Sequence, residues 1–287
     1  MYTIRPDEPL NPITVEILTA VQAVTQALGY AYLLVGATAR DMMMTHVFGI
    51  ESRRATHDVD FAIAVENWER FHALKAELVA RGDFAPAANK AHLLHYKPAQ
   101  HGTAFPLDLI PFGGVEQGAH QIAWPPDMSV VMDVTGYAEA LASALEVDIG
   151  NGVSIRVVSI PSLAALKLLA WNDRGLQDNK DAQDLFFLLQ HYHEAGNRDR
   201  MYEEAFALLE ACQFDLPLAG AALLGHDAGM LLEENSLRAL LAILAAPRKH
   251  DRLVVHMTRF GDIESDIAAQ LLNQFELGLQ MKKIPAA

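Results

Sequence analysis

The sequence of 287 residues contains a single cysteine, Cys212, which excludes an internal disulfide and any zinc site built from several cysteines. Cys212 stands in a stretch with a helical pattern, where a small buried side chain is commoner than a nucleophile. Basic residues are also few, because 22 Lys and Arg against 36 Asp and Glu leave a formal net charge of −14. This balance excludes a protein that coats nucleic acid nonspecifically and leaves only a local basic patch open.

Long apolar runs are absent as well. The longest, residues 216–225 and 237–247, are too short to cross a bilayer, and the N-terminal residues lack the apolar segment of a secretory signal. We therefore expect a cytoplasmic protein with no membrane partner. Hydrophobic residues make up 51% of the chain and charged residues 20%, which suits a globular protein with a large core.

Helix and strand patterns alternate up to about residue 160, and only helical patterns follow. The first part predicts helices at residues 12–28 and 68–81 and strands at residues 30–36, 58–65, 91–96, 105–110 and 153–160. The second part predicts helices at residues 161–173, 178–194, 200–212, 217–232, 235–246 and 261–280. The chain is therefore expected to be α+β, with a small mixed β-sheet flanked by helices and then an all-α C-terminal domain.

Two aspartates, Asp58 and Asp60, stand one residue apart at the start of an apolar, β-branched stretch. In a strand, residues i and i+2 point to the same face, so two like charges lie side by side. Neighbouring carboxylates raise each other's pKa and a divalent cation reverses this effect, so the pair of hard oxygen ligands indicates magnesium. Taken alone, so short a pattern is better explained by two solvated aspartates at a strand edge, because it occurs often by chance.

Gly36 ends a predicted strand and opens directly into a helix. Thr38 and Asp41 have the spacing of a capping box, which leaves backbone N–H groups beside Gly36 for a phosphate. Helix N-termini favour anions, and Arg40 adds a positive charge in the first turn. The stretch has neither the further glycines of a dinucleotide fingerprint nor the Gly-Lys-Ser/Thr of a P-loop, and an ordinary strand-to-helix turn stays an alternative.

Asp108 stands inside the apolar strand predicted at residues 105–110. A lone charge is costly to bury without a partner, so its side chain is expected to face another charged group. If this strand lies beside that of Asp58 and Asp60, three carboxylates converge on one face. Such a set can hold two magnesium ions, the arrangement that drives in-line displacement at phosphorus.

Lys167 is the only charge among the eleven residues from Pro161 to Trp171, a helix that is apolar on nearly every side. Its ammonium group is expected either to reach solvent along its aliphatic stem or to meet an anion. At the start of the next helix, Asp178 is the predicted N-cap and Asp181 its capping-box partner, which leaves Lys180 available to a ligand.

Taken in order, these motifs resemble those of the nucleotidyltransferase superfamily typified by DNA polymerase β. The stretch from Gly36 to Asp41 is similar to the Gly-Gly-x-x-Arg-Asp motif of tRNA nucleotidyltransferases, with Ala37 in place of the usual second glycine or serine. About sixteen residues separate Asp41 from Asp58, more than in those enzymes, and their base-selecting motifs have no counterpart. These departures favour another branch of the superfamily over CCA addition.

That branch is the AbiEii-type nucleotidyltransferases, many of them toxins of toxin–antitoxin systems. The stretches Leu166 to Ala170 and Lys180 to Leu185 are similar to motifs of this family, and the resemblance covers roughly residues 30–195. The change from mixed to helical patterns places a domain boundary near residues 150–160. With the resemblance, it predicts a palm-like nucleotidyltransferase domain at residues 1–158 and a helical domain at residues 159–287. The resemblance also adds an antitoxin as an expected partner.

The resemblance further implies that the chain moves a nucleoside monophosphate from a nucleoside triphosphate to an acceptor hydroxyl. Asp58 and Asp60 would hold both Mg²⁺ ions, and Asp108 would bind only the catalytic ion and help to remove a proton from the hydroxyl. The residues implied in nucleotide binding are Gly36, Ala37, Thr38, Arg40, Lys167 and Lys180.

The acceptor stays open between a tRNA 3′ end, a protein side chain and a small hydroxylated molecule. Basic residues that can surround a cleft for RNA are Arg53, Arg54, Lys90 and Lys97. Acidic residues that would repel a long nucleic acid are Glu139, Glu146, Glu233 and Glu234.

Two other functions are compatible with parts of the sequence. The dipeptide His57-Asp58 occurs in HD-type metal phosphohydrolases, but there it stands on a helix, whereas here it runs into a strand pattern. The second function is that of a catalytically inactive, transferase-like binding module. An inactive site, however, has no electrostatic reason to keep three carboxylates together. The pair His92 and His95, three apart in a predicted strand, has poor geometry for one metal.

Overall fold

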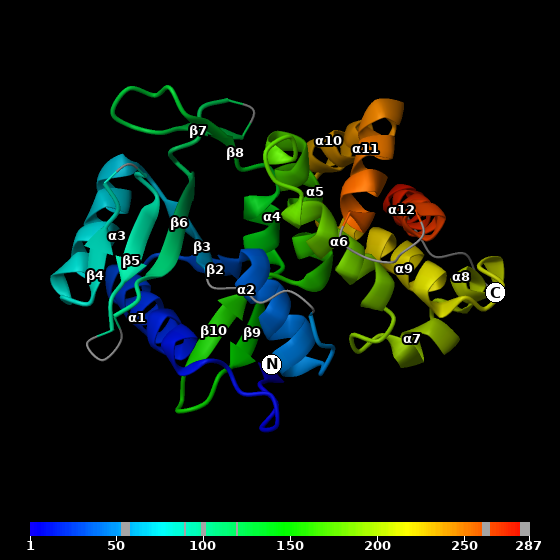
Figure 1. The fold of residues 1–287 in the computed structure, drawn as a ribbon, viewed down its shortest axis with the longest axis horizontal. Helices are drawn as coiled ribbons and strands as arrows, with labels where there is room; N and C mark the ends of the chain where they lie inside the picture. The colour runs from blue at the N-terminus through cyan, green and yellow to red at the C-terminus, as the bar shows by residue number, and fades with distance from the viewer. Residues whose placement is uncertain (53–57, 89, 99–101, 119, 260–264, 282–287) are drawn as a thin grey trace. The chain divides into compact units, whose positions relative to one another are not determined.

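The computed structural model divides into two compact units, Met1–Ser159 and Ile160–Ala287 (Figure 1). The residues that it describes are 1–52, 58–88, 90–98, 102–118, 120–259 and 265–281. Among these residues, every strand belongs to the first unit, and the second unit consists of helices. The predicted α+β fold, with a mixed sheet followed by an all-α part, is confirmed.

Eight strands of the first unit form one mixed sheet in the order β1-β9-β10-β2-β3-β6-β5-β4. Their bounds are β1 (Tyr2–Thr3), β2 (Tyr32–Val35), β3 (Val59–Val65), β4 (Phe84–Pro86), β5 (Leu93–Tyr96), β6 (Phe105–Gly113), β9 (Leu145–Asp148) and β10 (Ser154–Val157). At the centre, β3 runs parallel to β6 and antiparallel to β2. A separate small sheet pairs β7 (Gln121–Ala123) with β8 (Val131–Asp133).

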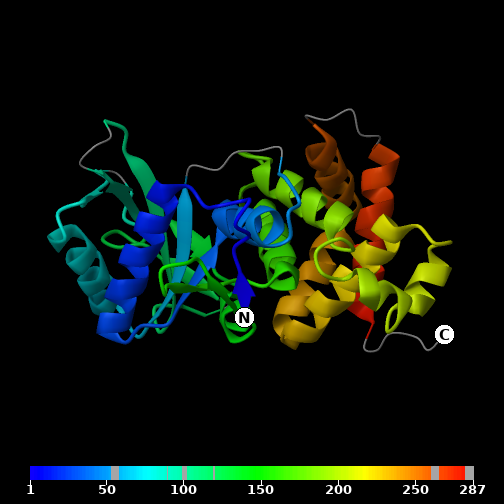
Figure 2. The ribbon, with the colours of Figure 1, turned by 90° about the horizontal axis from the view of Figure 1, so that it is seen from below.

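The helices of this unit begin and end where local signals place them. Helix α1 (Pro12–Leu28) has Pro at its first position, after Asn11, and ends at Gly29 in the left-handed conformation. Helix α3 (Trp68–Ala80) begins at the predicted N-cap Asn67, whose side chain accepts a hydrogen bond from the N–H of Arg70. The two helices pack against each other, as Figure 2 shows, and α3 also contacts β3 and β4.

Several elements of the first unit are not predicted from the sequence. Strands β1, β4, β7, β8 and β9 have only two to four residues each, which is too short for a clear alternation of apolar and polar positions. After the short helix α2 (Gly36–Asp41), the backbone continues as a π-helix, Met42–Val47, in which three consecutive methionines are buried. Helix α4 (Tyr137–Ala142) contacts β2 and β6.

The second unit contains eight helices among the described residues. They are α5 (Ile160–Arg174), α6 (Lys180–His191), α7 (Arg198–Tyr202), α8 (Phe206–Ala211), α9 (Leu216–Leu231), α10 (Glu234–Leu244), α11 (Pro247–Thr258) and α12 (Ser265–Gln280). The single helix predicted at residues 200–212 is wrong, because the chain turns between α7 and α8. Helix α11 is not predicted from the sequence, because Pro247 is expected to end the preceding helix. In the structure Pro247 starts α11, as proline can at the first helical position.

Helices α9 and α12 make the closest contact in the helical unit. A Cβ atom on Gly225 would overlap the backbone carbonyl of Phe275, and one on Gly278 would overlap that of Ala222. Only glycine therefore allows the two backbones to approach this closely. Within the described residues, no helix combines the length and the apolar character that crossing a membrane requires.

Candidate active site

The three aspartates singled out in the sequence lie together on two neighbouring strands. Strands β3 and β6 are parallel, and their register pairs Asp60 with Asp108. Asp58 stands immediately before β3, two residues from Asp60 and on the same side of the chain. One carboxylate oxygen from each residue lies within 4.8 Å of the other two. The convergence of three carboxylates expected from the sequence is therefore present.

This cluster fits a divalent cation in its chemistry. Asp58 is exposed, and Asp60 and Asp108 are half-buried, so the site is open to solvent on one side. Three ionised carboxylates this close repel one another, and a hard cation removes that repulsion. Mg²⁺ is bound by a few carboxylates and completes its shell with water and substrate phosphates. Among the described residues, no other group of three carboxylate, histidine or cysteine ligands lies as close together.

Gly36 brings the start of helix α2 directly against the carboxylate cluster. Its neighbour Val35 is paired with Asp60 in the register of β2 and β3, so the chain turns into α2 beside that carboxylate. The φ angle of Gly36 is +72°, and a Cβ atom at this position would overlap the carboxylate of Asp60. Glycine is required here for both reasons.

Thr38 holds the segment that carries Asp58. Its hydroxyl donates a hydrogen bond of 2.7 Å to the backbone carbonyl of Asp58, and its side chain is buried. The predicted capping box of Thr38 and Asp41 is wrong, because Val35 is the N-cap and makes no capping bond through its side chain. The hydroxyl of Thr38 instead links α2 to the residue that precedes β3.

Arg40 is buried beside the same turn. Only 1% of the residue is exposed, and its guanidinium Nε donates a hydrogen bond of 2.9 Å to Asp41. Ala37 is buried as well. Asp41 is therefore the ion-pair partner of Arg40. A role for Arg40 in phosphate binding stays a prediction.

Lys167 lies in a buried ion-pair cluster between α5 and α6. Its Nζ atom is 2.6 Å from Asp184 and 3.1 Å from Asp181, and all three side chains are at least 94% buried. Burial alone would lower the pKa of Lys167, but the two carboxylates outweigh it and raise that pKa. The ammonium group therefore meets anions of its own unit, and phosphate binding by Lys167 stays a prediction.

The capping box predicted for Asp178 and Asp181 is also wrong, because Asn179 is the N-cap of α6 and makes no capping bond through its side chain. Burial would raise the pKa of Asp181, but Lys167 and Arg174 lower it to about 2. Arg174 binds this carboxylate through Nε at 2.7 Å. Asp178 accepts a hydrogen bond from the N–H of Lys180, whose exposed side chain forms an ion pair with it at 3.2 Å.

His92 is a further residue beside the cluster that the sequence did not indicate. Its Nε2 atom lies 3.6 Å from Oδ1 of Asp108, and about a third of its side chain is exposed. The prediction treated His92 and His95 as members of one strand, but β5 begins only at Leu93. His92 belongs to the preceding turn, so the alternation of a strand does not govern its side chain. The signal in the sequence that could have indicated His92 is its position in a turn immediately before a strand.

Some candidate residues cannot be placed. His57, Arg53 and Arg54 lie outside the described residues, whereas Lys90 and Lys97 are exposed. Asp58 leads directly into β3, a strand, and this context differs from the helix that carries the His-Asp pair of HD phosphohydrolases.

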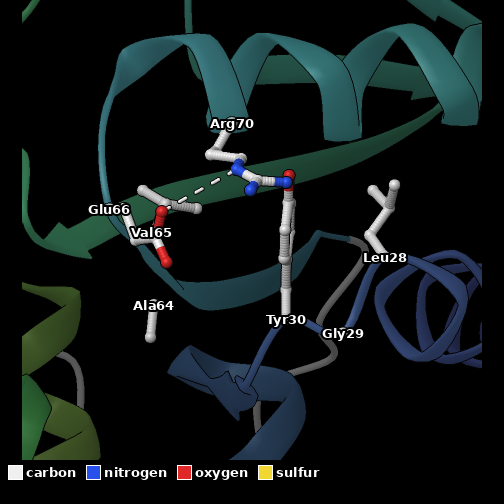
Figure 3. Close-up of a pocket in the computed structure, with 7 residues that line it drawn as sticks. All are labelled: Leu28, Gly29, Tyr30, Ala64, Val65, Glu66 and Arg70. Carbon is white, nitrogen blue, oxygen red and sulfur yellow. Dashed lines mark ion pairs between the residues drawn. The ribbon is translucent and has the colours of Figure 1, made fainter.

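A small cavity lies at the opposite end of β3 from the aspartates. Its volume is about 150 Å³. Figure 3 shows the residues that line it, between the end of β3 at Val65 and the start of α3. Arg70 and Glu66 flank it as an exposed ion pair at 3.9 Å, and the ring of Tyr30 forms one wall. Since β3 has seven residues, the cavity is roughly 20 Å from the carboxylates and separate from them.

A glycine turn and three carboxylates on adjacent strands of a mixed sheet define the nucleotidyltransferase class that the motifs resemble. The family described as Nucleotidyl transferase AbiEii toxin, Type IV TA system, matches residues 17–262. This match covers most of the 287 residues, so the chain belongs to the AbiEii family and is a nucleotidyltransferase. No protein with a curated description matches the sequence.

Solved structures of low sequence identity are similar to the chain. A nucleotidyltransferase-like antigenic protein from Paracoccidioides brasiliensis has a TM-score of 0.44 and 16% identity, covering 76% of this chain and 94% of that protein. ANT(2″)-Ia in complex with adenylyl-2″-tobramycin has a TM-score of 0.37 and 17% identity, covering 66% and 98%. The Thermotoga maritima CCA-adding enzyme complexed with tRNA has a TM-score of 0.26 and 12% identity, covering 95% and 82%.

Proposed function

We propose that this nucleotidyltransferase acts with Mg²⁺ at Asp58, Asp60 and Asp108, transferring a nucleoside monophosphate from a nucleoside triphosphate to an acceptor hydroxyl. The observation that carries the proposal is the register of β3 and β6, which sets Asp60 against Asp108 with Asp58 within 4.8 Å. When bound there, two Mg²⁺ ions would stabilise the charge on the entering and leaving oxygens of an in-line displacement.

The surrounding residues act by holding this arrangement. Gly36 keeps the start of α2 against Asp60, so the phosphate chain of the nucleotide can lie beside the carboxylates without a side chain in its way. Thr38 fixes the backbone of Asp58 through its hydrogen bond. Asp108 accepts the proton of the attacking hydroxyl. In this proposal Gly36, Ala37 and Thr38 line the nucleotide side of the site.

For the acceptor, the proposal favours the 3′ hydroxyl of an RNA, such as a tRNA, over a protein side chain. The support is local charge, because Lys90 is exposed two residues before His92 and Nζ of Lys75 bonds to the carbonyl of Ala91 next to it, although the chain carries −14 overall. A positive edge attracts a phosphate backbone. A toxin activity in the cytoplasm, with an antitoxin as partner, completes the proposal. Its support is the family description, which names a toxin of a Type IV TA system.

The experiment is incubation of the protein and MgCl₂ with each of the four α-³²P nucleoside triphosphates and a cell extract that is then separated into RNA and protein. We expect label in the RNA fraction, and none after Asp60→Asn or in EDTA. Glu77→Gln, which removes an exposed carboxylate from α3, is the matched control and should label as the wild type does. Label in the protein fraction would overturn the RNA acceptor, and label that persists after Asp60→Asn would overturn the mechanism.

A further inference from the structure

His92 stands at the end of a row of site residues that crosses four neighbouring strands. The sheet order β2-β3-β6-β5 places Gly36 after β2, Asp60 on β3, Asp108 on β6 and His92 just before β5. The register pairs Asp108 with Leu93, the residue after His92. The imidazole therefore lies on the far side of the carboxylates from the glycine turn.

His92 and Asp108 lie close enough together for one ligand atom to contact the imidazole and the exposed edge of the carboxylate. Nε2 of His92 and Oδ1 of Asp108 are 3.6 Å apart, which is longer than a hydrogen bond. Oδ1 is buried, whereas about a quarter of the Asp108 side chain and a third of that of His92 are exposed. A ligand oxygen from solvent therefore meets this carboxylate at its other oxygen, Oδ2, and can lie within the roughly 2.7 to 3.0 Å of a hydrogen bond from Nε2.

Neighbouring groups hold the imidazole in place. The backbone carbonyl of His92 accepts a hydrogen bond of 3.0 Å from the N–H of Leu109, the residue after Asp108. Its ring packs on the buried indole of Trp124 with 5.4 Å between centroids. One residue earlier, the carbonyl of Ala91 accepts a hydrogen bond from Nζ of Lys75 on α3. The segment is thus fixed to both the sheet and a helix, as a binding group requires.

The direction of the reaction assigns this position to the acceptor. In an in-line transfer the entering and leaving oxygens lie on opposite sides of the α-phosphorus. On the proposed function, the phosphate chain lies at Gly36, so pyrophosphate leaves on the β2 side and the attacking hydroxyl enters on the β5 side. We propose that His92 binds the acceptor, with Nε2 hydrogen-bonded to the attacking hydroxyl oxygen and holding it against Asp108.

The step balances without a further reactant. The hydroxyl oxygen forms a bond to the α-phosphorus as the bond from that phosphorus to the bridging oxygen of pyrophosphate breaks. The leaving oxygen keeps the electron pair, and the hydroxyl proton passes to the carboxylate of Asp108. His92 positions the oxygen and exchanges no proton, so its loss should weaken use of the acceptor more than binding of the nucleotide.

The test compares His92→Ala and His92→Gln with the wild type, and His95→Gln is the control from the same segment. Transfer of label from the α-³²P nucleotide is measured against increasing amounts of the cell fraction that the wild type labels, and Mn²⁺ binding is measured by calorimetry. His92→Ala should raise the half-saturating amount of acceptor about tenfold, the equivalent of one hydrogen bond. The half-saturating nucleotide concentration and the Mn²⁺ affinity should not change.

The conservative variant tests the hydrogen bond itself. Gln can hydrogen-bond an oxygen at similar reach, so His92→Gln should recover part of the loss, and His95→Gln should match the wild type. Unchanged acceptor saturation in both His92 variants would overturn the inference while leaving the proposed function intact. A fall in Mn²⁺ affinity that parallels the loss of transfer would also overturn it, because His92 would then act through Asp108. If the wild type labels neither fraction, the proposed function fails, and this inference fails with it.

Discussion

Lys167 and Asp184 form a buried ion pair in which Nζ lies 2.6 Å from the carboxylate oxygen Oδ2. Asp181 shares the ammonium group at 3.1 Å, and both aspartates belong to α6, whereas the lysine belongs to α5. The pair therefore joins two helices of the C-terminal unit. A residue whose sequence context suggested phosphate binding has an evident structural task, and the predictions below separate the two roles.

Replacing Lys167 by Met should destabilise the protein by roughly 3 to 5 kcal/mol. The change keeps the apolar stem and leaves two buried carboxylates without the ammonium charge, a situation that costs this much in proteins. Urea unfolding followed by circular dichroism measures the loss. Lys180→Met, which removes an exposed lysine at the start of α6, should change stability by less than about 0.5 kcal/mol. Wild-type stability of Lys167→Met together with lost transfer would instead support phosphate binding.

The same cluster should make stability depend on acid pH. The pKa of Asp181 is lowered from 3.8 to about 2 in the folded protein, so its contribution is complete above about pH 4 and disappears as pH falls through about 2. Since one pKa unit equals about 1.4 kcal/mol, about 2 kcal/mol is involved. The stability difference between wild type and Asp181→Asn, measured by urea unfolding, should be constant from pH 7 to 5 and shrink below pH 4. A difference that stays constant down to pH 3 would contradict this coupling.

Gly36→Ala should abolish nucleotidyl transfer and lower stability by about 1 to 3 kcal/mol. The added Cβ would overlap the carboxylate of Asp60, and the alanine would have to adopt a backbone φ of +72°, which side-chain-bearing residues rarely do. Gly29→Ala is the matched control, because its φ is +71° and nothing lies within 4 Å of the added atom. The control should lose about 1 kcal/mol from backbone strain alone and keep full transfer. Equal effects of both changes on transfer would remove Gly36 from the site.

Asp58→Asn and Asp60→Asn should each abolish transfer and leave the metal-free protein as stable as the wild type or more stable. Each change relieves repulsion between carboxylates that lie within 4.8 Å of one another. Thermal unfolding in EDTA and in MgCl₂ tests this. We expect Mg²⁺ to raise the wild-type Tm, because it binds the folded state, and to leave the Tm of both variants unchanged. Strong destabilisation of either variant in EDTA would indicate a structural role for that aspartate.

Local patterns predicted much of the fold and the centre of the site. The apolar alternation after Asp58 predicted strand β3, and Asn67 predicted the start of α3. The predictions that failed within the site are those in which a side chain found a partner distant in sequence. Thr38 has the spacing of a capping box but bonds to the backbone of Asp58, twenty residues away. Asp181 has the same spacing signal and is engaged by Lys167 of another helix.

The sequence by itself determined the family, the change from a mixed α/β part to a helical part, and the three carboxylates of the candidate site. These follow from residue types and short spacings, which act along the chain. Only the tertiary structure decided that Asp60 faces Asp108 and that Lys167 is buried among aspartates. It also decided that His92 precedes strand β5 and lies beside the carboxylate cluster. Strand register and burial depend on contacts between segments far apart in sequence, and no local pattern contains that information.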